Sequence, residues 1–240
     1  MAPRPVVLDA AGTLLELRHR VGETYAGLAR EVGVEVDPEA VEEAFRRAFG
    51  AAPPLAFGDL EPDLRRVAER DWWRRIVRES VMAAGAPADL PFERLFDLAW
   101  EWFAVPAAWR VPNDVRPGLR ALRRAGHPLA VLSNWDGRLA GLLEGVGLRG
   151  YFVRVLVSAD LPAAKPSPDA FRAAARALAG LGSEAPIMVG DRVDHDVGPA
   201  LAAGWDAIWL DREGRGGATG GASRVSTLRA VALDPLCRDS

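Results

Sequence analysis

The sequence predicts an α/β protein: a doubly wound, Rossmann-like parallel sheet with a small four-helix cap domain. From residue 112 onward, short apolar runs alternate with helical patterns, and this alternation is typical of a parallel sheet covered by helices on both faces. Between the first apolar run and residue 112 the pattern is almost purely helical. We therefore predict a core domain at 1–15 and 111–240 and a cap domain at 16–110.

The run Val6-Val7-Leu8 is predicted to begin the sheet. It is short, apolar and partly β-branched, and Asp9 and Gly12 follow it, as expected for a buried parallel strand that meets a turn. Asp9 is thereby placed at the carboxyl end of a strand, where sheets of this class bind their ligands.

The cap is predicted from helical spacing and from helix-start signals. Val21, Tyr25, Leu28 and Val32 recur at helical intervals. Asp37-Pro38 has the form of an N-cap followed by a first-turn proline. The tryptophans of this part are expected in the core of the bundle. Three further helices are predicted, from Asp37 to Phe49, from Pro62 to Ala84, and from Pro91 through Trp100.

The second part of the chain supplies the other strands and the helices between them. A glycine-rich stretch at 214–223 is predicted to be a flexible loop, and residues 227–236 a closing helix. The predicted strands are 129–134, 153–159, 187–191 and 207–211, and the predicted helices are 117–125, one ending near Leu142, one after Pro168 and one near Val197.

Polar residues stand where these strands end. Because the carboxyl ends of parallel strands meet at one edge, we expect their side chains to converge. A carboxylate nucleophile needs an electrophile whose negative charge is shielded, and a divalent cation with a lysine ammonium shields a phosphoryl group in this way. Lys165 is the only lysine in the chain. The residues are Asp9 and Thr13, Ser133 and Asn134, Lys165, and Asp191, Asp194 and Asp196.

Composition limits the partners. The formal charge of −3 and the pI near 5.7 give no basic surface for nucleic acid, and no segment has the length of a membrane span. The N-terminus does not have the pattern of a signal peptide, so a cytoplasmic location is expected. The single cysteine, Cys237, excludes an internal disulfide. A small phosphorylated substrate is the expected partner, and the oligomeric state stays open.

Four motifs in order resemble the haloacid dehalogenase superfamily: VVLDAAGTL, LSNW, AAKPSPDAF and VGDRVDHD. The helical insert falls between the first and second motifs, where this family places its cap. The resemblance implies a hydrolase, most often a Mg²⁺-dependent phosphatase that forms an aspartyl-phosphate. It implies Asp9 as nucleophile, Lys165 as catalytic and phosphate-binding residue, Thr13, Ser133 and Asn134 as phosphate-binding residues, and Asp9, the Ala11 backbone carbonyl, Asp191 and Asp196 as metal ligands.

The sequence departs from the family pattern at Ala11. The family normally has a second aspartate there, which protonates the leaving group and activates water. Loss of such acid–base catalysis typically lowers a rate by roughly 10²–10⁴-fold. The metal site is expected to survive, because a backbone carbonyl is retained. We therefore expect a slow phosphatase, or one that is selective for good leaving groups.

Three other functions share part of this pattern. A degenerate protein that only binds a phosphorylated ligand or a protein partner is the main one. A 2-haloacid dehalogenase needs no metal, and Gly190-Asp191 argues against it. A phosphonate-cleaving enzyme needs a cap lysine, and the cap has none. Hinges are expected near Leu15–Arg18 and Val111–Pro112, and Arg46, Arg47 and the cap tryptophans are candidates for substrate specificity.

Overall fold

The computed structural model describes residues 4–182 and 184–238. Contacts divide the chain into two compact units. The sheet unit comprises residues up to Glu16, Leu55–Asp59 and residues from Val111 onward, and the helical unit comprises Leu17–Pro54 and Leu60–Arg110. The segment Leu55–Asp59, which lies within the predicted cap, groups with the sheet unit. The backbone of this segment is hydrogen-bonded to the sheet unit. The N–H groups of Phe57 and Gly58 donate to the carbonyls of Ala159 and Leu161, and the Leu55 carbonyl accepts from the Ser158 hydroxyl.

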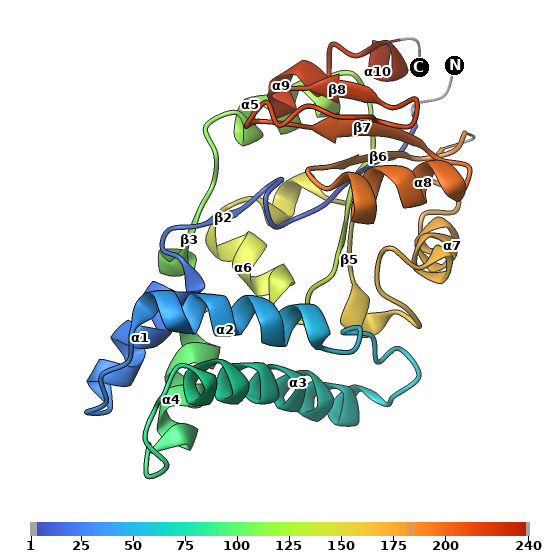
Figure 1. The fold of residues 1–240 in the computed structure, drawn as a ribbon. Helices are drawn as coiled ribbons and strands as arrows, with labels where there is room; N and C mark the ends of the chain where they lie inside the picture. Colours follow the sequence, from blue (N-terminus) through green and yellow to red (C-terminus); the bar gives the residue numbers. More distant parts are fainter. Residues whose placement is uncertain (1–3, 183, 239–240) are drawn as a thin grey trace. The chain divides into compact units, whose positions relative to one another are not determined.

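In the described part of the chain, a six-stranded parallel sheet forms the sheet unit (Figure 1). The strand order is β5-β4-β1-β6-β7-β8. After β1, the chain adds β4 and β5 on one side of it and then β6, β7 and β8 on the other side. The direction of strand addition therefore reverses at β1, between β4 and β6. The strands are β1 Val6–Leu8, β4 Leu129–Ser133, β5 Arg154–Val157, β6 Ile187–Gly190, β7 Asp206–Leu210 and β8 Ser223–Val225.

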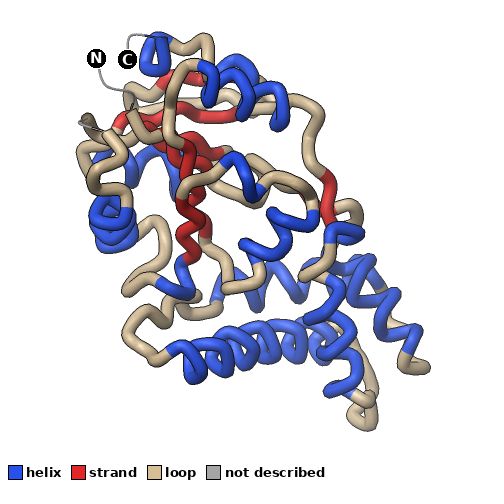
Figure 2. Tube along the Cα trace, turned by 180° about the vertical axis from the view of Figure 1, so that it is seen from behind, coloured by secondary structure: helices blue, strands red, loops and turns tan. Residues whose placement is uncertain are grey.

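Helices cover both faces of this sheet, as the doubly wound prediction requires (Figures 1 and 2). On one face, the buried side chains of Val7, Leu132 and Met188 form a common core with those of Phe171 and Ala200 from α7 and α8. On the other face, α5 packs against α9 and β4. The helices of this unit are α5 Val115–Arg124, α6 Leu139–Gly145, α7 Pro168–Ala177, α8 Gly198–Ala202, α9 Leu228–Val231 and α10 Pro235–Arg238.

The helical unit contains the four predicted helices. Its core is built from apolar residues at helical spacing, with Tyr25 packed edge-on against Phe45 and Phe103 at ring-centroid distances of 6.1 and 5.9 Å. The Asp37 carboxylate accepts hydrogen bonds from two backbone N–H groups of the first turn and is the N-cap that the sequence predicts. Trp72 is buried, as expected. The helices are α1 Val21–Glu31, α2 Pro38–Ala51, α3 Pro62–Ala83 and α4 Phe92–Trp102.

Several short elements differ from the prediction or were not foreseen. The glycine-rich stretch runs into strand β8, and the expected closing helix is two short helices, α9 and α10. Two-residue strands pair at the connections between the units. Within the described residues, no helix has the length and apolar character of a membrane span. The short elements are β2 Glu16–Leu17, β3 Trp109–Arg110, the 3₁₀ turns Pro106–Ala108, Arg149–Tyr151 and Ser158–Asp160, and a π-helical turn, η4, at Val193–Val197.

Candidate active site

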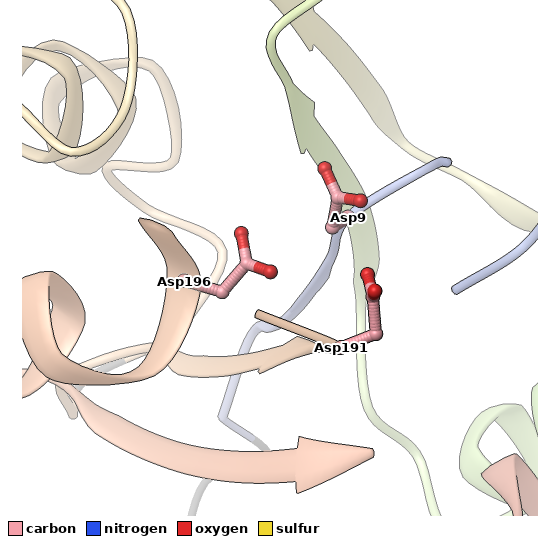
Figure 3. Close-up of side chains that lie close together, drawn as sticks. All are labelled: Asp9, Asp191 and Asp196. Atoms are coloured by element: carbon pink, nitrogen blue, oxygen red, sulfur yellow. The ribbon is translucent and has the colours of Figure 1, made fainter. Parts of the chain in front are cut away.

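Three carboxylates meet at the carboxyl edge of the sheet. Asp9 follows β1, Asp191 follows β6, and Asp196 lies in the turn η4. One carboxylate oxygen from each lies within 4.8 Å of the others, and Figure 3 shows the three side chains directed toward a common space. Hard oxygen donors in this number are the kind of ligand set that Mg²⁺ takes, together with water and substrate oxygens.

Lys165 joins this cluster from the loop before α7. Its ammonium Nζ lies 2.8 Å from Asp9 Oδ1 and 2.6 Å from Asp196 Oδ1, and the residue is buried. Burial opposes a charge on the ammonium, but the carboxylates of Asp196 and Asp9 outweigh it and raise the pKa of Lys165 above its ordinary value. The sole lysine of the chain is therefore a fixed positive charge beside the predicted nucleophile.

Ser133 orients the Asp9 carboxylate. It is the last residue of β4, the neighbour of β1, and its hydroxyl donates to Asp9 Oδ1 at 3.0 Å. Lys165 donates to the same oxygen, so both donors fix the rotation of one carboxylate. The predicted convergence of these strand-end residues is thus present in the structure.

Asn134 has a different environment from the one expected for a phosphate-binding side chain. Its amide group donates to the Lys165 carbonyl at 2.7 Å and accepts from the Lys165 backbone N–H at 2.9 Å. The Asn134 side chain therefore fixes the backbone from which the Lys165 ammonium extends.

Asp191 carries unbalanced negative charge. Burial and the carboxylates of Asp9 and Asp196 raise the pKa of Asp191 from 3.8 to about 6. The Thr13 hydroxyl lies 3.4 Å from its Oδ1, a long hydrogen bond, and the Arg215 guanidinium lies 3.8 Å from its Oδ2. Burial and the two neighbouring carboxylates therefore oppose ionisation of this group.

Two glycines make the close approach of the carboxylates possible. Gly12 has φ +81°, and a Cβ built on it would lie 2.6 Å from the Asp191 carboxylate. A Cβ on Gly190 would overlap the Asp196 carboxylate. A side chain at either position would force a carboxylate of the cluster to move, which gives the glycines of the first and fourth motifs a steric reason.

The remaining predicted residues lie at the border of the site. Ala11 is exposed and has no group that can exchange a proton. Asp194 is exposed and pairs with Arg192 at 2.6 Å, and its carboxylate lies outside the cluster of three. His195 lies against Asp194.

Sequence reasoning missed the residues that support these groups. The carbonyl of Asp191 accepts from the indole Nε1 of Trp209 at 3.1 Å and from Arg215 at 3.2 Å. Arg212 holds the loop after Asp9 through two carbonyls. In a chain that is rich in arginine, neither arginine stands out, and the only available signal was their position after the last predicted strand.

Comparisons with known proteins agree with this geometry. The family model described as haloacid dehalogenase-like hydrolase matches residues 4–204. A human haloacid dehalogenase-like hydrolase domain-containing protein 3 is 33% identical over 237 residues, which is 99% of this chain and 86% of that protein. A phosphoserine phosphatase of Thermus thermophilus is 36% identical over 140 residues, 58% of this chain and 54% of that protein. The structure of a 2-haloacid dehalogenase from Pseudomonas syringae superposes with a TM-score of 0.67, at 23% identity, and covers 99% of this chain and 100% of that one.

Proposed function

The chain belongs to the haloacid dehalogenase-like hydrolases, and on this premise we propose that it is a Mg²⁺-dependent phosphatase of a small phosphorylated metabolite. The observation that carries the proposal is the cluster of Asp9, Asp191 and Asp196 around one buried ammonium, Lys165. Three carboxylates and one lysine leave net negative charge, which a divalent cation would balance. A displacement on a haloalkane needs no such cation.

The donor set fits Mg²⁺. Asp9 and Asp191 supply carboxylate oxygens on the ends of neighbouring strands, Asp196 lies beside them, and the Ala11 carbonyl is the fourth proposed protein donor. The raised pKa of Asp191 supports the same assignment. Burial and the carboxylates of Asp9 and Asp196 raise it, and a nearby cation would favour the ionised form again. When bound, Mg²⁺ supplies shielding of the negative charge of a phosphate group.

The residues of the chain then have distinct tasks. Asp9 attacks phosphorus and the alkoxide leaves, so that an aspartyl-phosphate forms and the P–O bond of the ester breaks. Water then attacks the phosphoryl group, the bond between the Asp9 oxygen and phosphorus breaks, and inorganic phosphate leaves with the proton of the water, so that the Asp9 carboxylate is regenerated. Lys165 and the Ser133 hydroxyl both donate to Asp9 Oδ1 and so orient the nucleophile. Because they lie beside the attacking carboxylate, the same two groups contact the phosphate oxygens.

Ala11 limits which esters can react. The leaving alkoxide needs a proton, and the position that supplies it in the family pattern carries a methyl group here. Esters whose leaving group is stable without a proton, such as acyl or aryl phosphates, avoid this step. The proposed enzyme therefore prefers acyl and aryl phosphates to sugar phosphates.

Phosphate release from acetyl phosphate, p-nitrophenyl phosphate and sugar phosphates tests the proposal. We expect release that needs Mg²⁺, stops in Asp9→Asn and extends to sugar phosphates in Ala11→Asp. Asp191→Asn should also stop release, because it removes a proposed metal ligand. Asp194→Asn is its matched control, since Asp194 is an exposed acid of the same segment. Failure of both the wild type and Ala11→Asp to release phosphate from any substrate would contradict the phosphatase proposal.

The same experiment separates two other functions. A degenerate member of the family would be stabilised against heat by a phosphorylated ligand without forming product. A dehalogenase would release chloride from 2-chloropropionate in the presence of a chelator, and Asp191→Asn would leave that activity intact.

A further inference from the structure

Arg212 binds the loop that follows the predicted nucleophile. It lies two residues beyond β7, and its side chain is 19% exposed. Nη1 donates to the Gly12 carbonyl at 2.6 Å and Nη2 donates to the Thr13 carbonyl at 2.8 Å. Nε donates to Asp114 Oδ2 at 3.1 Å. One guanidinium thus holds two consecutive carbonyls of the loop and is itself held by a carboxylate.

The loop has little freedom on its other side. The Ala10 carbonyl accepts from the backbone N–H groups of Leu14 and Leu15 at 2.8 and 2.9 Å, and Gly12 N–H donates to the Leu15 carbonyl at 2.8 Å. Gly12 also lies directly against the Asp191 carboxylate. The loop is therefore fixed between Arg212 and Asp191, and a shift of a few tenths of an ångström changes its distance to the carboxylate cluster.

The geometry calls for arginine in particular. Two neighbouring carbonyls and one carboxylate need three donors in a planar arrangement, which a guanidinium has and an ammonium lacks. Asp114 is anchored independently, because its Oδ2 also accepts from the Leu228 backbone N–H at 2.7 Å. The orientation of Arg212 is therefore set by the framework of the sheet unit.

We propose that Arg212 is a positioning residue for the metal site. It fixes the carbonyls of Gly12 and Thr13, which directly follow the peptide that carries the Ala11 carbonyl. The inference rests on the proposed function for the identity of the metal. Residue 11 has no acidic side chain, so its only proposed metal ligand is its main-chain carbonyl. The placement of that carbonyl depends on the bonds of Arg212 to the next two carbonyls, those of Gly12 and Thr13. Supporting groups of this kind typically change metal affinity by roughly 10–100-fold when they are lost.

Arg4 offers a matched control at the amino end of β1, the end opposite to the one that Asp9 follows. It precedes β1, is buried, and donates twice to the Ala185 carbonyl, at 2.9 and 2.7 Å, and also to the Asp206 carboxylate. It therefore joins β1 to the segments at β6 and β7 with bonds of the same kind, far along the strands from the carboxylates. Replacing either arginine by glutamine removes a similar set of bonds.

Calorimetric titration of the full chain with Mg²⁺, without substrate, tests the inference. We expect Arg212→Gln to weaken Mg²⁺ binding by about tenfold, and added guanidinium ions to restore part of the affinity in Arg212→Ala. We expect Arg4→Gln to lower the melting temperature while its Mg²⁺ affinity stays within about twofold of the wild type.

Two results would overturn the inference: wild-type Mg²⁺ affinity in Arg212→Gln, or an equal loss of affinity in Arg4→Gln, which would indicate a general loss of stability. The proposed function fails separately. A wild type that binds Mg²⁺ but releases no phosphate from any ester removes the phosphatase proposal and leaves the role of Arg212 to be decided by the titration.

Discussion

The side-chain amide of Asn134 makes two hydrogen bonds to the main chain of Lys165, one to its carbonyl at 2.7 Å and one from its N–H at 2.9 Å. This pairing joins the end of β4 to the loop before α7, through two residues that are 31 positions apart. The ammonium of Lys165 then reaches Asp9 from a fixed backbone. The order of the motifs in the sequence does not reveal this dependence.

Asn134→Ala is predicted to displace Lys165. Both hydrogen bonds are lost, and the backbone carbonyl and N–H of Lys165 must find other partners. We expect phosphate release to fall by roughly 10–100-fold, because small displacements of catalytic groups have effects of this size. The measurement is kcat for acetyl phosphate at saturating Mg²⁺.

Ser167→Ala is the control for this change. Ser167 lies two residues after Lys165 and caps α7 through the Asp169 N–H at 3.3 Å. This variant should be about 1 kcal/mol less stable than the wild type, and its kcat should stay within about twofold of the wild-type value. Equal kcat in Asn134→Ala and the wild type would show that the Lys165 backbone does not need this pairing.

Asp191→Asn is predicted to stabilise the metal-free protein at high pH. Burial and the carboxylates of Asp9 and Asp196 raise the pKa of Asp191 from 3.8 to about 6, so ionising it in the folded state costs roughly 3 kcal/mol. The stability that the protonated group contributes is present below pH 4 and is lost as the pH rises through 6. Asparagine does not ionise, so the variant does not lose stability in this way as the pH rises.

Thermal melts in a chelator at pH 4.5 and pH 8 measure this difference. The variant should gain stability over the wild type as the pH is raised, and saturating Mg²⁺ should reverse the order at pH 8 by binding only the wild type tightly. A wild type that stays as stable as the variant in the chelator at pH 8 would contradict the assigned pKa.

Cys237 is predicted to be unreactive in the folded protein. Burial, with a smaller effect of Asp234, raises the pKa of its thiol to about 12, and the residue is only 3% exposed. Since the thiolate is the reactive form, alkylation by iodoacetamide at pH 8 should be slow in the native protein and fast in urea. Rapid labelling of the native protein would mean that the C-terminal segment opens readily.

The arrangement of strands could be predicted from the sequence because it depends on local patterns. Short apolar runs ended by polar residues predicted the positions of Asp9, Ser133 and Asp191, and the parallel sheet brought them together. The same reasoning could not predict strand β8, because it lies at the edge of the sheet and its three residues, Ser223–Val225, have no apolar run.

The supporting contacts of the site could not be predicted in this way. The bond between Arg212 and the Gly12 carbonyl joins residues 200 positions apart, and the Asn134 pairing spans 31. A side chain that binds a backbone carbonyl leaves no pattern in the sequence of its partner, because every residue has a carbonyl. The grouping of Leu55–Asp59 with the sheet unit has the same origin, since backbone hydrogen bonds hold much of this segment.

Gly190→Ala is predicted to disrupt the site without any strain in the backbone. Gly190 ends β6, and an added Cβ would overlap the Asp196 carboxylate, which accepts from the Arg192 N–H and from Lys165. Asp196 has to move, so we expect a loss of about 1–3 kcal/mol in stability, as for other overpacked positions, and a large loss of Mg²⁺ affinity. Gly141→Ala in α6 is the control, because a Cβ there meets no atom within 4 Å and alanine favours a helix. Urea unfolding and Mg²⁺ titration of both variants measure the effect, and wild-type Mg²⁺ affinity in Gly190→Ala would show that Asp196 is not needed where the structure places it.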